Sequence, residues 1–94
     1  MARPKYIQVS PRFFENENVQ LIEAMPGGNK ILVIWFKLLC LADRNLQVAH
    51  SNDELSTFLN RPVPVVQMAL YALEQYGLLS IDDAGTITLL PPTT

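Results

Sequence analysis

Charge is scarce in this sequence. Only 17% of the 94 residues are charged and the formal net charge is −2, whereas a typical soluble domain is about 25% charged. Domains that bind nucleic acid on their own are usually strongly basic, because neutralised phosphates supply most of their affinity. Any contact with DNA must therefore come from a local cluster of cations. A small chain with so few charges is also expected to expose apolar surface, which favours self-association.

Cysteine and histidine are scarcer still. The single cysteine, Cys40, excludes an internal disulfide framework, and its place in an apolar segment predicts an inert side chain in the core. The single histidine, His50, has no Cys or His at ligand spacing, so we expect no metal site. The sequence contains no Gly-rich phosphate loop and no Ser/His/Asp set. We therefore expect neither an enzyme nor a protein that holds a cofactor or a small-molecule substrate.

Long hydrophobic runs are also lacking. The longest apolar run, residues 31–42, is interrupted by Lys37 and is shorter than the roughly 20 residues that a membrane span needs. The start of the chain carries no apolar signal segment. We expect a soluble protein of the cytoplasm, which is the host cytoplasm if the chain is phage-encoded, with no membrane partner.

The first half of the chain predicts two helices. Asn16 or Asn18 can cap a short helix with apolar residues at three-residue steps, and the Pro-Gly-Gly of residues 26–28 ends it. A second helix is expected over residues 29–44, and it is apolar around almost its whole circumference, with Trp35 in the core. Such a helix is typically buried at the centre of a fold. Its polar stripe consists of three cations seven residues apart: Lys30, Lys37 and Arg44.

The second half predicts a helix-turn-helix followed by a hairpin. Residues 46–50 alternate weakly and can form a short strand. Ser51 and Glu54 then have the spacing of a capping box, and Asn60 is suited to end the helix that they begin. After a tight turn, a second helix is expected over residues 62–75.

Gly77 ends that helix, and two strands follow. Residues 78–81 and 86–89 are expected to pair across a four-residue turn, in which Asp82 and Asp83 are turn residues rather than a catalytic pair. The predicted fold is mainly α with a small β-hairpin, a winged helix-turn-helix. We expect one domain, with an N-terminal arm (1–12), a winged-helix core (13–90) and a tail or the start of a linker (91–94).

From Lys5 to Leu89 the chain resembles the N-terminal domain of phage replisome organisers, which are related to the DnaD-type primosome proteins. The residues that carry the resemblance are Lys5-Tyr6, Phe13-Phe14, Leu21-Ile22-Glu23, Met25-Pro26-Gly27, Lys30-Ile31 and Trp35 to Leu39. The resemblance implies a role in starting DNA replication, by binding at a phage origin and recruiting helicase-loading proteins. The alternative is a MarR-like transcriptional regulator, because such regulators share the winged-helix pattern of the second half.

The outward face of the second helix-turn-helix helix is the first candidate site, and it contains no Lys or Arg. Its members are Pro64, Gln67, Met68, Tyr71 and Gln75. Tyr and Met are enriched at protein interfaces, which favours a contact with another protein, centred on Pro64, Met68 and Tyr71. The alternatives are base reading, in which Gln67 or Gln75 contacts adenine and Tyr71 a phosphate, and a plain solvated face.

The cations are the second candidate site. Lys30, Lys37 and Arg44, extended by Arg61, either line up against DNA phosphates or are solvated heads above a buried helix. Arg3, Lys5 and Arg12 form a loose basic N-terminal arm, which either enters a minor groove or is an exposed, frayed terminus. The segment around Tyr6 and Phe13 is a second candidate for a protein interface. We expect a homo-oligomer, with double-stranded DNA and a helicase-loading or other replication protein as candidate partners.

Overall fold

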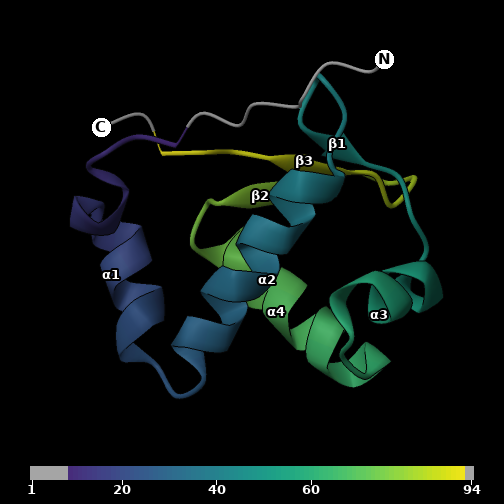
Figure 1. The fold of residues 1–94 in the computed structure, drawn as a ribbon, viewed down its shortest axis with the longest axis horizontal. Helices are drawn as coiled ribbons and strands as arrows, with labels where there is room; N and C mark the ends of the chain where they lie inside the picture. The colour runs from purple at the N-terminus through teal and green to yellow at the C-terminus, as the bar shows by residue number, and fades with distance from the viewer. Residues whose placement is uncertain (1–8, 93–94) are drawn as a thin grey trace, which may run out of the picture.

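The protein is described by a computed structural model over residues 9–92. Within this range the chain forms one short 3-10 helix, four α-helices and three short strands. Their bounds are η1 Phe13–Glu15, α1 Glu17–Ala24, α2 Gly28–Leu41, β1 Gln47–Val48, α3 Asn52–Leu59, α4 Val63–Gln75, β2 Leu79–Ile81 and β3 Ile87–Leu89. Figure 1 shows α2 crossing the middle of the molecule between α1 and α3, with the strands gathered at one end.

The helix-turn-helix and its wing form as the sequence predicts. The hydroxyl of Ser51 accepts from the backbone of Glu54 and the carboxylate of Glu54 accepts from the backbone of Ser51, so the capping box is complete. Asn60 ends α3 in the left-handed conformation, with φ 55°, and α4 follows after a tight turn. Gly77, with φ 76°, turns the chain into the hairpin β2–β3. This is a winged helix-turn-helix.

The strand predicted before α3 completes the sheet. The three strands are antiparallel in the order β1-β3-β2, and Val48 of β1 pairs with Ile87 of β3. The hairpin itself pairs Ser80 with Thr88. Because β1 joins α2 to α3, its pairing with β3 holds the wing against the helical part. No helix within residues 9–92 is long and apolar enough to cross a membrane.

The end of α2 differs from the prediction. The helix stops at Leu41 rather than at Arg44, because Ala42 adopts an extended conformation with φ −68° and ψ 151°. The carboxylate of Asp43 then accepts from the backbone amides of Asn45 and Gln47 at 2.8 and 3.0 Å, which stabilises a turn in place of a helix. Arg44 therefore lies in the α2–β1 turn, and the predicted stripe on α2 contains only two of its three cations.

The core is built around Trp35, as expected. Its ring stacks on that of Phe13, with centroids 5.3 Å apart, and its indole N–H donates to the backbone carbonyl of Leu78 at 2.8 Å. This bond ties the middle of α2 to the start of the wing. Phe13 is only 2% exposed whereas Phe14 is 54% exposed. The prediction of Phe13 as an interface residue was therefore wrong, because the 3-10 turn directs its ring into the core.

Cys40 also departs from the prediction. It lies on the exposed side of α2 rather than in the core, on the side that carries Lys30, Val33 and Lys37. The exposed side of α2 is thus wider than its apolar composition indicates.

Candidate protein and nucleic-acid interface

The outward face of α4 has the composition and exposure that the sequence predicts. Pro64, Gln67 and Gln75 are exposed, and Met68 and Tyr71 are 59% and 65% exposed. The opposite side of the helix packs into the core through Val66, Ala69, Leu70 and Leu73. The result is a partly apolar face that contains no cation and is bordered by the exposed acid Glu74.

A hollow lies on the side of α4 that faces α2. Lys30 at the start of α2 and Arg61 in the α3–α4 turn both line it, together with apolar residues that include Ile34, Val65 and Met68. No acid among the described residues lines it. We call this feature the cationic hollow. The fold thus unites two of the four predicted phosphate-binding cations.

Lys37 has a structural contact that the sequence does not reveal. Its ammonium donates to the backbone carbonyl of Leu59 at 3.3 Å, at the last residue of α3, where helix carbonyls lack partners within the helix. The cation thus ties α2 to the end of α3, two residues before Arg61. Arg44 does not join this group, because it lies in the α2–β1 turn.

A second groove lies on the other side of α4, between that helix and the wing. Gln67, Tyr71 and Glu74 of α4 line it together with His50 and Asn52, over an apolar floor that includes Leu55 and Ile87. The carboxylate of Glu74 accepts from the backbone amide of Ile81 at 3.3 Å. An acid therefore lies between α4 and the wing, and we call this feature the wing groove.

The turn of the wing adds further negative charge. The carboxylate of Asp82 accepts from the amides of Ala84 and Thr86, both at 2.9 Å, so Asp82 is a turn residue as predicted. Asp83 beside it is exposed. The two sides of α4 thus differ in sign, with cations toward α2 and acids toward the wing.

The start of α3 contains a further acid with a perturbed pKa. The backbone N–H of Ser51, which donates to the Glu54 carboxylate at 2.9 Å, lowers the pKa of Glu54, and the Ser51 hydroxyl and His50 add to the effect. The Nδ1 of His50 lies 3.6 Å from that carboxylate. No group of side chains within residues 9–92 could hold a metal ion.

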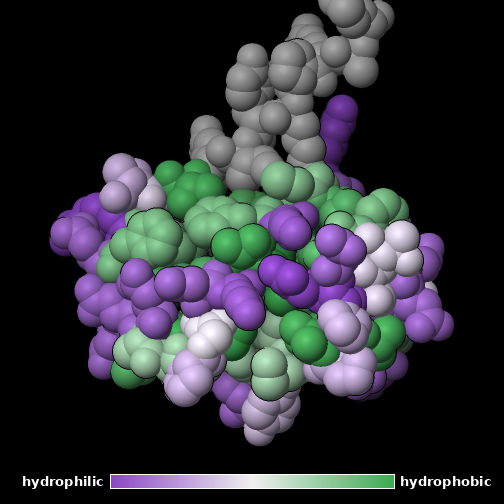
Figure 2. Space-filling model, turned by 60° about the horizontal axis from the view of Figure 1, so that its bottom comes forward, coloured by the Kyte–Doolittle hydropathy of each residue, from purple (hydrophilic) through white to green (hydrophobic). Residues whose placement is uncertain are grey.

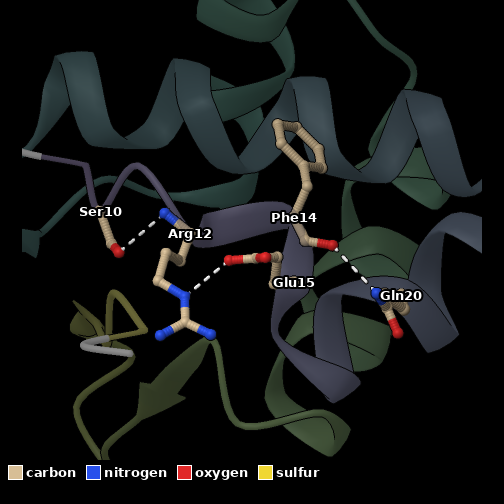
Figure 3. A network of polar contacts seen from close by, with 5 residues as sticks. All are labelled: Ser10, Arg12, Phe14, Glu15 and Gln20. Carbon is tan, nitrogen blue, oxygen red and sulfur yellow. Dashed lines mark hydrogen bonds and ion pairs between the residues drawn. The ribbon is translucent and has the colours of Figure 1, made fainter.

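The described end of the N-terminal arm is ordered rather than loose (Figure 3). The Nε of Arg12 pairs with the Glu15 carboxylate at 2.6 Å, the Arg12 amide donates to the Ser10 hydroxyl, and the Gln20 side chain donates to the carbonyl of Phe14. The charge of Arg12 is therefore offset locally, which corrects its placement in a free basic arm. The other candidates on that arm, Arg3, Lys5 and Tyr6, lie outside the described residues.

The surface as a whole is of mixed polarity. Figure 2 shows hydrophobic and hydrophilic residues interspersed over one face of the molecule, with a band of hydrophilic residues across its middle. Interfaces between proteins that also exist apart are about as polar as the rest of their surface. The mixed surface is therefore compatible with contacts between copies.

Comparison with known proteins supports the resemblance drawn from the sequence. The model of the N-terminal phage replisome organiser family matches residues 6–91. The match includes the first half of the chain as well as the winged-helix pattern of the second half. A comparison with curated proteins finds no match.

One solved structure, described as "Structure of Rep-DNA complex", contains a chain of similar fold. The TM-score is 0.65 at 22% sequence identity, and the alignment covers 96% of this chain and 78% of that chain. At this identity the similarity shows the fold, and it agrees with the winged helix-turn-helix described above.

Proposed function

Because the chain belongs to the N-terminal phage replisome organiser family, we propose that it helps to start DNA replication as a module that associates with its own copies and binds duplex DNA weakly. The observation that carries the proposal is the outward face of α4, which is exposed at Met68 and Tyr71 and has no cation. In this account α4 contacts protein, and DNA is held through phosphates alone.

The charge distribution supports DNA binding without base recognition. Base-reading helices are usually anchored by Arg or Lys contacts to phosphate and guanine, and the outward face of α4 offers only amides and a phenol. Lys30 and Arg61 line the same hollow, and Lys37 contacts the end of α3 two residues before Arg61. The neighbour described as "Structure of Rep-DNA complex" supports DNA as a partner for this fold.

The proposed association explains how weak binding serves an origin. A few phosphate contacts give marginal affinity at physiological salt, but several linked copies raise the effective concentration of each binding site without new contacts. We propose that the assembly forms in the cytoplasm of the host cell at a phage origin, and that it recruits helicase-loading proteins, as the family implies.

A salt series tests the DNA part of the proposal. Fluorescence anisotropy of a labelled duplex should show weak binding with little difference between two unrelated sequences. Three neutralised phosphates give a slope of log affinity against log salt near −2.7, from about −0.9 per phosphate. Nanomolar binding that prefers one sequence would show that α4 reads bases, and no binding at low salt would remove DNA from the function.

A further inference from the structure

The sides of α4 differ in charge, and the difference bears on where a duplex can lie. On the α2 side, the cationic hollow has Lys30 and Arg61 at its edge and no acid among its described lining residues. On the wing side, Glu74 lines the groove and Asp83 is exposed at the tip. DNA phosphates are attracted to the first side and repelled by the second.

We propose that the sugar–phosphate backbone of duplex DNA binds at the cationic hollow, and that the wing makes no phosphate contact. The proposal deepens the proposed function and rests on it. In this arrangement the wing lies outside the DNA footprint. The recognised chemistry is that of a phosphodiester backbone rather than of bases.

The residues of the hollow suit such a ligand. Lys30 and Arg61 come from two different elements, so a backbone that crosses the hollow meets a cation from each. Between them the lining is apolar, with Val65 on the α4 side, which suits a deoxyribose. The first turn of α2 contains no acid, so no side chain there offsets the charge of Lys30.

The wing lacks the features of a phosphate-binding loop. Its turn, residues 82–85, contains two acids and no cation. One of these acids, Asp82, accepts from two amides of the turn, so those N–H groups are not available to an anion. A duplex against this turn would meet Asp83 without a compensating charge.

Four charge-reversal variants of the full chain test the proposal in pairs. Arg61→Glu alters the hollow, and Arg44→Glu makes the same change at an exposed cation in the α2–β1 turn. Asp83→Lys alters the wing, and Glu23→Lys makes the same change on α1. The side chains of Arg61 and Asp83 are not part of the core, so thermal unfolding should confirm that all four variants fold.

The binding of each variant to one labelled duplex is then measured across a salt series. Arg61→Glu should weaken binding and make the salt slope less negative by about 0.9, which corresponds to one lost phosphate contact, while Arg44→Glu should leave the slope unchanged. Asp83→Lys should change affinity no more than Glu23→Lys. A slope for Asp83→Lys that is steeper by about 0.9 would place the wing on DNA and overturn the proposal.

Three further outcomes are decisive. Equal losses for Arg44→Glu and Arg61→Glu would refute the assignment of the hollow while DNA binding itself stands. If the wild-type chain binds no duplex at low salt, the proposed DNA function fails instead. A glutamate-rich peptide with the same net charge as the duplex serves as a competitor. If this peptide displaces the labelled duplex as effectively as unlabelled duplex does, the hollow is a site for acidic protein and the proposal is overturned.

Discussion

Gly28→Ala should be strongly destabilising, because α1 and α2 meet there without room for a side chain. Gly28 is buried at the first position of α2. A Cβ on this residue would lie 1.8 Å from the carbonyl oxygen of Ile22 and 2.8 Å from its carbonyl carbon. Both atoms belong to the backbone of α1, so no side-chain rotation can relieve the clash. The whole of α1 must move away from α2.

Two opposing effects set the magnitude. Alanine favours a helix over glycine by up to about 1 kcal/mol, which would stabilise the variant. Overpacking of a core costs about 1–3 kcal/mol, and displacement of α1 also withdraws Val19 and Ile22, both fully buried, from part of their contacts. We expect a net loss of about 2 kcal/mol, which corresponds to a fall in Tm of roughly 8–16 °C for a domain of this size.

Gly27→Ala is the matched control. Gly27 precedes Gly28, and a Cβ on it meets no atom within 4 Å, but its φ of 73° is left-handed. An alanine there costs only about 1–2 kcal/mol of backbone strain. Thermal unfolding followed by circular dichroism at 222 nm should place both variants below wild type, with Gly28→Ala no more stable than Gly27→Ala. A Gly28→Ala variant as stable as wild type would refute the close approach of α1 and α2.

Two other predictions concern the core and the start of α3. Trp35→Phe removes the donor to the buried carbonyl of Leu78 and should cost about 1–3 kcal/mol in urea unfolding; an unchanged midpoint would contradict the bond. The pKa of Glu54 is lowered from 4.5 in the folded state, so the ionised carboxylate stabilises the fold at a pH above 4.5. This contribution is lost as the pH falls through the lower pKa of the folded state. Glu54→Gln should therefore lower Tm at pH 7 and match wild type in strong acid, and a difference that persists in acid would contradict the assignment.

The features predicted correctly from sequence are those with local causes. The Ser51–Glu54 capping box acts within four residues, and Asn60 and Gly77 stand where the chain must adopt positive φ. The spacing of apolar residues was enough to separate the inward and outward faces of α4. Such signals need no knowledge of what packs against the helix.

The errors arose where tertiary packing decides the outcome. Positions 13 and 14 are both phenylalanine, so the residue type does not indicate which ring is buried. The 3-10 turn, which packs Phe13 against Trp35, determines it. Cys40 was misplaced because an apolar helix does not reveal which of its sides lacks a neighbour. The end of α2 depended on the side chain of Asp43.

The candidate site was predicted in its residues but not in its arrangement. Nothing in the sequence pairs Lys30 with Arg61, because the cationic hollow exists only once α4 packs on α2. The bond from Ile81 to Glu74 and that from Lys37 to Leu59 likewise join distant segments. These contacts give α4 one basic and one acidic side.

The central claim is that the outward face of α4 joins copies of the chain, and sedimentation equilibrium of wild type and Tyr71→Glu at tens of micromolar tests it most directly. Tyr71 is 65% exposed, so its replacement should leave the fold intact while placing a charge in the contact. The account predicts a dimer or larger assembly for wild type, a monomer for Tyr71→Glu, and wild-type behaviour for Leu21→Glu, a control on the exposed side of α1. A monomeric wild type, or a Tyr71→Glu variant that assembles normally, would contradict it.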